Sequence, residues 1–197
     1  MDRVPLYQKV AAKMKISLLR QALSVSAVLA TLCTALPAHA AQAAATHACA
    51  IKPYGLIGAR WNELGGEKSG LGCPAAVEAD VYRDGVWAGR RQRFARGQMV
   101  WSPGEGPKLV VSAWSIGGYA YVDWRSTLPR VYHRFLVRWT SAADSGGVNR
   151  EVGGGDGGRM RVRVATSGGY RFYVQGCDVG ISGSGCTHGW TVSVTAR

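Results

Sequence analysis

The chain reads IGARW at residues 57–61, LGG at 64–66, SGLGCP at 69–74, FARG at 94–97 and MVWSP at 99–103. The apolar side chains at 57, 61 and 64 recur at helical spacing, so we expect one short helix that stops at the glycine pair 65–66. The residues after position 74 have the composition of strands and tight turns. This stretch therefore predicts a small module in which a short helix precedes β-hairpins.

Two turn signals divide the second half of this module. Asp84-Gly85 separates VYR at 81–83 from VW at 86–87, and this dipeptide between apolar runs is a strong signal for a two-residue hairpin. Arg96-Gly97 predicts a second turn before the strand at 99–101. We therefore expect short antiparallel strands at 81–83, from 86 onward and at 99–101.

In this order and spacing, the pieces between residues 57 and 103 resemble one copy of the LGFP repeat, a module of secreted, cell-wall-associated bacterial proteins. The resemblance implies binding at the cell envelope rather than catalysis, and it implies a core role for Trp61 and Trp101. Two departures are visible. Cys73 stands at the third position of the name-giving tetrapeptide, and a single copy is visible where the family commonly has several in tandem.

The first 40 residues have the pattern of a secretory signal peptide. Four basic residues between positions 9 and 20 precede an apolar run at 22–36, and AHA at 38–40 places small residues around a cleavable bond. No later run approaches the roughly 20 apolar residues that a transmembrane helix needs. We therefore expect a mature chain that begins near Ala41, has no transmembrane anchor, and is extracellular or associated with the cell wall.

The mature chain is strongly basic. Removing residues 1–40 takes away five of the 24 basic groups and one of the 12 acidic groups, which leaves 19 against 11, a net charge of +8. Only Lys52, Lys68 and Lys108 among these cations are lysines, and arginine binds carboxylate and phosphate bidentately. One explanation of this excess of positive charge is that it serves to bind an anionic polymer; the alternative is that it reflects only a bias in amino-acid composition. Export argues against nucleic acid as the partner.

An even number of cysteines remains in the mature chain, which predicts two disulfides in an oxidising compartment. These cysteines are Cys49, Cys73, Cys177 and Cys186. Three connectivities are possible, and sequence separation favours 49–73 and 177–186. A zinc site is the alternative, but the chain has no Cys-x-x-Cys pair, and His47 and His188 lie at no usual ligand spacing. We expect neither a metal nor a cofactor.

Residues 108–197 read as antiparallel strands. RMRVRV at 159–164 places three arginines on one face and apolar residues on the other, and the same alternation recurs at 135–139, 170–174 and 190–194. Weaker strands at 109–114 and 119–124 complete the pattern of a small β-sandwich of fibronectin-like or immunoglobulin-like type.

The expected fold class is therefore mainly β, with a disulfide-bonded LGFP-like module followed by an antiparallel β-sandwich. The expected divisions are a signal peptide at 1–40, an Ala-rich mobile segment at 41–50, the LGFP-like module at 51–106 and the sandwich at 108–197. The glycine-rich stretch 144–158 is expected to be a flexible hairpin loop, because its three carboxylates are too few to hold calcium.

The sequence contains few patterns that are typical of catalytic sites. GISGS at 180–184 misses the Gly-x-Ser-x-Gly pattern of a hydrolase nucleophile elbow by one position. Asp123, His133, Glu78 and Asp80 are the candidates for acid and base chemistry, and no recognisable motif pairs them. We therefore expect a protein without enzymatic activity and assign no catalytic residue.

Aromatic side chains are the remaining candidates for ligand binding, since all seven tryptophans follow residue 40. Trp87, followed by three arginines, is the best candidate for a sugar-stacking patch, and Tyr119 and Tyr121 share one strand face with Asp123. Core packing is the alternative for each ring. The predicted ligand-binding residues are Trp87, Arg90, Arg91, Arg93, Tyr119 and Tyr121.

Two functions remain open at this stage. The first is a secreted, non-catalytic protein that binds peptidoglycan or a linked polysaccharide, either anionic or neutral. The second is a secreted inhibitor or accessory subunit of a cell-wall hydrolase or protease, in which the loop from Cys177 to Cys186 makes the contact.

Overall fold

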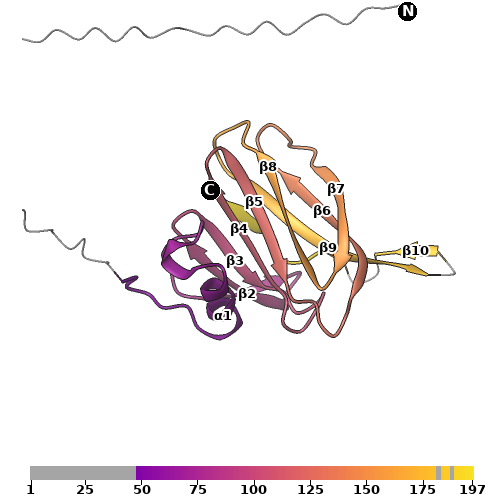
Figure 1. Ribbon diagram of the computed structural model, residues 1–197, viewed down its shortest axis with the longest axis horizontal. Helices are drawn as coiled ribbons and strands as arrows, with labels where there is room; N and C mark the ends of the chain where they lie inside the picture. Colours follow the sequence, from indigo (N-terminus) through magenta and orange to yellow (C-terminus); the bar gives the residue numbers. More distant parts are fainter. Residues whose placement is uncertain (1–47, 181–182, 187–188) are drawn as a thin grey trace, which may run out of the picture. The chain divides into compact units, whose positions relative to one another are not determined.

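A computed structural model describes residues 48–180, 183–186 and 189–197 of the chain (Figure 1). The expected signal peptide and most of the Ala-rich segment lie outside these residues. The described chain is mainly β, as expected, with one α-helix, α1 (Gly55–Glu63), and one 3-10 turn, η1 (Gly66–Lys68). No helix in this part of the chain is long and apolar enough to cross a membrane.

The strands form two antiparallel sheets. The first sheet has the order β1-β2-β3-β4-β5-β8, with bounds β1 (Ala79–Arg83), β2 (Val86–Phe94), β3 (Gly97–Trp101), β4 (Val110–Ile116), β5 (Tyr119–Arg125) and β8 (Gly157–Arg163). The second has the order β10-β9-β6-β7, and β11 also pairs with β9; the bounds are β6 (Tyr132–Thr140), β7 (Val148–Gly155), β9 (Tyr170–Gly180), β10 (Gly183–Gly185) and β11 (Val194–Ala196). The first sheet joins five sequential strands, which differs from the Greek-key order of the immunoglobulin fold.

The main core lies between the two sheets. Val122 and Trp124 of β5 face Phe135 of β6 and Phe172 of β9, and all four side chains are buried. The rings of Trp124 and Phe135 meet edge to face, with centroids 5.3 Å apart. The alternation at 135–139 and 170–174 is thereby confirmed, because its apolar members point into this core. At the C-terminus Val192 is buried as expected, although β11 begins only at Val194.

A second, smaller core lies beneath α1 on the outer side of the first sheet. The predicted helix is confirmed: Ile57 and Trp61 are buried, and Gly65, with φ 105°, follows its last turn. The Trp61 indole donates to the carbonyl of Gly72 at 3.0 Å, which ties the helix to the following turn. This cluster consists of Cys49, Ile57, Trp61, Leu71, Phe94, Met99, Val110 and Trp114, with Trp101 packed against it.

Both predicted turns are present, and the second has a different register. Asp84 and Gly85, with φ of 51° and 79°, join β1 to β2, and both lie in the left-handed region that this two-residue turn requires. Phe94 pairs with Gly97, so the second turn consists of residues 95–96 and Gly97 opens β3. A side chain at 97 would place its Cβ 1.8 Å from the Ala113 carbonyl, so the close approach of β4 requires glycine.

Both predicted disulfides are confirmed. Cys49 bonds Cys73 and ties the segment before α1 to the turn after it, and Cys177 bonds Cys186 across the β9–β10 hairpin. Cys49, Glu67 and Cys73 form the one grouping of potential metal ligands in the described part of the chain. Because both sulfurs of this group are in the disulfide, they are not available as thiolate ligands.

The expected flexible loop at 144–158 is wrong. Residues Val148–Gly155 form strand β7, which pairs with β6, and Val148 and Val152 pack against the main core. After Asp156 the chain crosses to the other sheet as β8. Three of these glycines, Gly154, Gly157 and Gly158, lie where the chain packs closely; a Cβ at Gly154 would lie 2.2 Å from the His133 carbonyl.

The expected boundary between module and sandwich is also not a domain boundary. Strand β3, from the predicted module, pairs with β4, from the predicted sandwich, and Met99 lies opposite Ser112 in this register. The two parts share one sheet and one compact unit. The Pro and Gly residues at 102–107 suggested a linker because a loop between neighbouring strands needs the same residue types.

Dividing the chain tests this single-unit architecture. We expect neither residues 48–107 nor residues 108–197 to fold alone, because the cut separates β3 from β4 and exposes Val100 and Val111, which are fully buried. Dispersion of amide resonances and cooperative melting should be present in the intact chain 41–197 and absent in each piece. A cooperatively melting piece would contradict this expectation.

The loop between β3 and β4 is anchored by a buried carboxylate. Glu105 is 2% exposed, and its Oε2 accepts a hydrogen bond from the Gly176 amide of β9 at 3.0 Å. The Tyr132 hydroxyl donates to the backbone carbonyl of the same residue. Burial raises the pKa of Glu105, and the hydrogen bonds from Gly176 and Tyr132 and the charge of Arg130 oppose the shift without cancelling it.

This carboxylate makes stability depend on pH. Because the folded pKa is raised, its favourable contribution is complete below the ordinary value of 4.5 and is lost as the pH rises through the folded pKa. The free energy of unfolding of the neutral Glu105→Gln variant should therefore rise relative to that of the native chain as the pH rises. Urea unfolding across pH 4 to 9 measures the difference. Glu63→Gln, an exposed change of the same kind, should follow the native profile; parallel profiles for all three proteins would contradict the expectation.

Candidate functional site

The outer face of β4, β5 and β8 carries a regular array of aromatic and charged side chains. Alternate residues of β5 point outward, because Ala120, Val122 and Trp124 fill the core. The register places Tyr121 between Trp114 and Arg161 of the neighbouring strands. We call this array the arginine–tyrosine face; it consists of Trp114, Tyr119, Tyr121, Asp123, Arg159, Arg161 and Arg163.

Rings and guanidinium groups alternate across this face. Trp114 and Tyr121 stack with centroids 5.4 Å apart and planes within 4°. Arg161 lies over the Tyr119 ring at 4.4 Å and Arg159 over the Trp114 ring at 5.4 Å, both within the range of cation–π attraction. A guanidinium group that lies over a ring can still donate N–H hydrogen bonds to an anion or a hydroxyl. Trp114 is buried, so the face offers the rings of Tyr119 and Tyr121 as stacking surface, with charged donors beside them.

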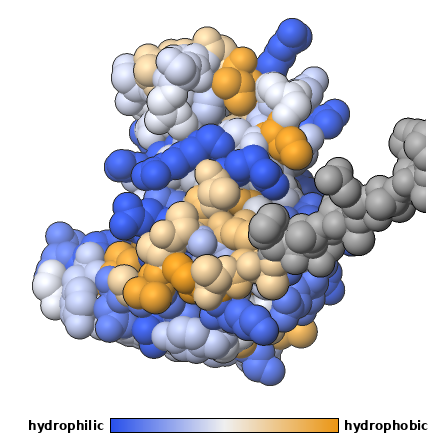
Figure 2. All heavy atoms as spheres, turned by 90° about the vertical axis from the view of Figure 1, so that its left-hand side faces the viewer, coloured by the Kyte–Doolittle hydropathy of each residue, from blue (hydrophilic) through white to orange (hydrophobic). Residues whose placement is uncertain are grey.

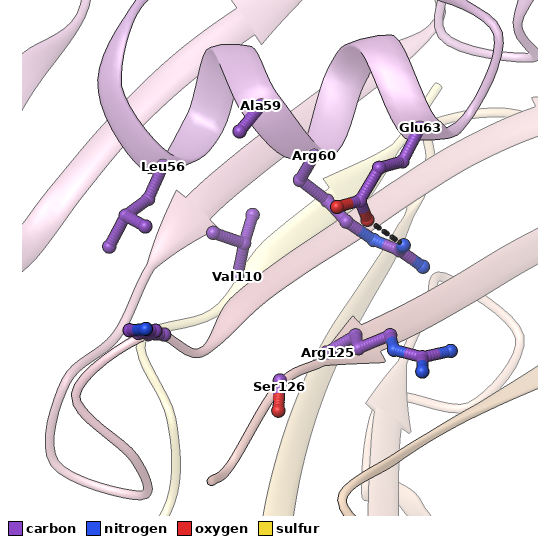
Figure 3. Close-up of a pocket in the computed structure, with 8 residues that line it drawn as sticks. Leu56, Ala59, Arg60, Glu63, Val110, Arg125 and Ser126 are labelled. Atoms are coloured by element: carbon purple, nitrogen blue, oxygen red, sulfur yellow. Dashed lines mark hydrogen bonds and ion pairs between the residues drawn. The ribbon is translucent and has the colours of Figure 1, made fainter.

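The molecule has mixed polarity around α1. Seen from the left of Figure 1, it shows an apolar patch bordered by hydrophilic side chains (Figure 2). A small pocket of about 160 Å³ lies between α1 and the adjoining ends of β4 and β5. Leu56 and Ala59 project from the helix toward Val110 of β4, and Arg60 and Arg125 lie at one end of the pocket (Figure 3).

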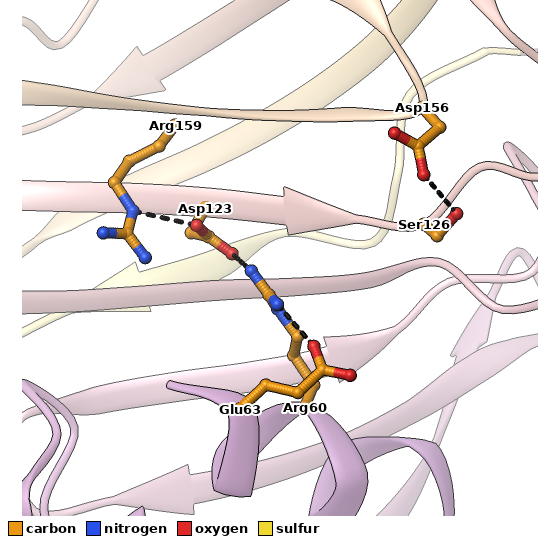
Figure 4. Close-up of polar contacts among 6 residues, drawn as sticks. All are labelled: Arg60, Glu63, Asp123, Ser126, Asp156 and Arg159. Atoms are coloured by element: carbon orange, nitrogen blue, oxygen red, sulfur yellow. Dashed lines mark hydrogen bonds and ion pairs between the residues drawn. The ribbon is translucent and has the colours of Figure 1, made fainter. Parts of the chain in front are cut away.

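A buried carboxylate joins the helix to the arginine–tyrosine face. Asp123, whose side chain is 6% exposed, accepts from Arg60 at 2.5 Å and from Nε of Arg159 at 2.9 Å, and Arg60 also pairs with Glu63 (Figure 4). Burial alone would lower the pKa of Arg60, but Asp123 and Glu63 outweigh it and raise that pKa. Asp123 thus balances two arginines and leaves Arg161 as an exposed cation on the face.

The structure divides the patch predicted around Trp87. A bulge in β2 brings Trp87 and Arg90 to one face, where the indole donates to Asp80 at 3.0 Å and Arg90 pairs with Glu78 at 2.8 Å. Arg91 lies on the opposite face and donates to the Ser193 carbonyl. Burial and the nearby charge of Arg171 lower the pKa of Arg91. Arg93 shares that opposite face, since it is two residues further along the strand.

Trp87 itself remains accessible. It is 40% exposed, meets Trp101 edge on with centroids 5.4 Å apart, and lines a shallow hollow of about 400 Å³ with Arg83 and Trp190. A second hollow of about 410 Å³ shares these last two residues and adds Tyr173. Trp190 is an aromatic residue that the sequence interpretation assigned only to a strand.

The acid and base candidates are all held by other partners. Arg90 pairs with Glu78, and burial raises the pKa of this carboxyl despite the charge of Arg90. Asp80 accepts the Trp87 indole. His133 is exposed, and its Nδ1 accepts from the amide of residue 179 at 3.2 Å. Asp123, Asp80 and His133 thus lie on three different strands and form no common cluster.

Of the predicted binding residues, the structure brings Tyr119 and Tyr121 into one site. The sequence interpretation missed Trp114 and the arginines of β8 as members of that site. The alternation at 159–163 was visible, but β8 pairs with β5 across an interval that contains β6 and β7. A pairing between strands so distant in sequence leaves no local signal.

No family model, no curated protein and no solved structure matches this chain. The LGFP resemblance therefore remains a prediction from the sequence pieces, and the function is argued from the geometry of the face.

The two carboxylates that share Arg60 provide a matched test of this site. We expect Asp123→Asn to lower the free energy of unfolding by about 2–4 kcal/mol, because it leaves the partly buried Arg60 and the stacked Arg159 without their common partner. Glu63→Gln removes an exposed partner of the same arginine and should change stability by less than about 0.5 kcal/mol. Urea unfolding measures both, and equal effects would contradict a central role for Asp123.

Proposed function

We propose that this protein is a secreted, non-catalytic protein of the cell envelope that binds peptidoglycan or a polysaccharide linked to it through the arginine–tyrosine face. One observation carries the proposal: the partly exposed rings of Tyr119 and Tyr121 interleave with the exposed arginines of β8, and the buried Trp114 ring stacks beside Tyr121. The leader pattern, the LGFP-like pieces and two disulfides support an envelope location, since disulfides persist in oxidising compartments.

The shape of the face favours a polymer. Small ligands are held in concave pockets that enclose most of their surface, whereas this face is the open side of a sheet. Its outward positions on β5 run from Tyr119 to Asp123, and successive outward side chains along a strand are about 7 Å apart. An extended chain can therefore contact several rings and arginines at once, and weak contacts add along its length.

The charge of the face favours an anionic polymer. Three arginines stand on it against the single carboxylate Asp123, which is already shared with Arg60. Arginine forms paired hydrogen bonds with carboxylate and phosphate oxygens, and the tyrosine rings supply apolar area with a polar tip. A neutral polysaccharide would use the rings and could accept hydrogen bonds at its hydroxyl groups, but it would gain nothing from the positive charge.

A second candidate function has one observation in its favour. Strand β9 extends beyond the body of the sandwich and pairs with β10, and Cys177–Cys186 closes this hairpin (Figure 1). Val179 on the hairpin is 50% exposed. A projecting, disulfide-closed hairpin suits insertion into an enzyme cleft, so an inhibitor or an accessory subunit of a wall hydrolase is the alternative.

Retention on purified cell walls tests the first proposal. Arg161→Gln and Tyr119→Ala should each weaken binding of the mature chain by about fivefold or more, because each removes half of a cation–π pair at the face. Arg93→Gln makes the same charge change at an exposed position on another strand and should leave binding nearly unchanged. Binding should also weaken with added salt, since the Debye length falls from about 10 Å at 0.1 M to about 3 Å at 1 M.

Three outcomes count against the proposal. Equal losses in Arg161→Gln and Arg93→Gln would mean that net charge alone drives retention. If the native chain does not bind walls, the proposed binding to the cell envelope is wrong. The second candidate function would replace the first if the protein inhibits or captures a wall hydrolase through the β9–β10 hairpin and does not bind walls.

A further inference from the structure

The pocket beside α1 continues the arginine–tyrosine face. Arg125 lies two residues beyond Asp123 on β5, so both side chains point to the outer side of the sheet, and Arg125 pairs in register with Val110 of β4. At about 160 Å³ the pocket is smaller than the roughly 300–1,000 Å³ that enclose drug-sized ligands. It therefore suits one small group at the end of a larger molecule.

The floor of the pocket is aliphatic and its mouth is cationic. Leu56, Ala59 and Val110 supply the floor (Figure 3). Lys108 and Arg125 are exposed at the mouth, and no hydrogen bond or ion pair joins either side chain to another described residue. These two cations differ from Arg60, which Asp123 and Glu63 already neutralise.

One carboxylate stands on the helix side of the same pocket. Glu63 is 60% exposed, and its pairing with Arg60 fixes its position. Ser126 also lines the pocket, but its hydroxyl donates to Asp156 at 2.8 Å. Glu63 is therefore the hydrogen-bond acceptor at the end of the pocket where Arg125 lies, and Arg125 is the donor there (Figure 3).

We propose that this pocket binds the terminal carboxylate of a peptide whose last residue has a small aliphatic side chain, such as the alanine that ends a stem peptide of peptidoglycan. The inference rests on the proposed function, because it identifies the part of the wall that reaches beyond the face. The carboxylate pairs with Arg125, the methyl group lies on the aliphatic floor, and the last peptide N–H donates to Glu63.

The charges select against other small anions. A phosphate monoester carries a charge of about −1.5 to −2 at pH 7 and has no N–H for Glu63, so this carboxylate repels it. A carboxylate brings one negative charge, and a small side chain matches the limited volume of the floor. The outward positions on β5 then place a glycan strand along the tyrosines and its peptide end beside Arg125, about 20 Å from Tyr119.

Calorimetric titration of the mature chain with N-acetyl-D-alanyl-D-alanine and with its C-terminal amide tests the pocket. The acid should bind, and the amide should bind at least about tenfold more weakly, the loss expected when one charge-assisted hydrogen-bonded contact is removed. Arg125→Gln should weaken binding of the acid by a similar factor. Ala59→Leu should also weaken it, because the larger side chain fills the floor from an exposed helix position that tolerates the change.

The matched control is Arg93→Gln, which makes the same charge change at an exposed position of β2, away from the residues that line the pocket. It should leave the peptide affinity unchanged. Equal affinity for acid and amide, or no binding of either at millimolar concentration, would overturn the proposal. Preference for the L,L peptide would assign the pocket to a protein C-terminus instead of a wall peptide and would overturn the stated ligand.

The two proposals fail separately. Retention on walls that depends on Arg161, together with no peptide binding, would remove the pocket proposal and keep the proposed function. Peptide binding that depends on Arg125, together with no retention on walls, would remove the proposed function and keep a carboxylate pocket.

Discussion

The antiparallel pairing of β3 with β4 is the constraint on which the rest of this structure depends. It joins the helix-containing N-terminal part to the strands that follow residue 108, so that one six-stranded sheet runs through both. Its inner side packs on the second sheet, and α1 covers part of its outer side. Because α1 covers only that part, the tyrosines of β5 and the arginines of β8 remain accessible, and the pocket lies beside the helix.

Electrostatics then organise the open part of the sheet. Buried charges are tolerated when they are paired and hydrogen-bonded, and Asp123 meets this condition through Arg60 of α1 and Arg159 of β8. The same carboxylate thereby holds the helix against the sheet and orients an arginine over Trp114. Nearby rings fix the guanidinium of Arg161 in the same way. Preorganised cations of this kind lose little side-chain freedom when a ligand binds, which favours recognition over non-specific attraction.

The second sheet has a different part in the molecule. It supplies half of the main core and, through Gly176, the partner of the buried Glu105 that fixes the loop between β3 and β4. Its edge continues into the disulfide-closed β9–β10 hairpin. A chain of this size thus presents two contrasting surfaces, a flat face suited to a polymer and a projecting hairpin suited to a cleft, and the two functional readings correspond to them.

The sequence by itself determined the local features, because each of them depends on residues close together in the chain. Helical spacing at 57–64, the Asp84-Gly85 turn, the alternating strands and the choice of cysteine pairs all follow from such patterns, and the structure confirms them. Tertiary structure alone decided which strands are neighbours. The pairing of β3 with β4 removed the expected domain boundary, a bulge separated Trp87 and Arg90 from Arg91, and β8 brought its arginines beside Tyr119 and Tyr121. These contacts depend on how two sheets bury their apolar faces together, a property of the whole chain that no short segment encodes.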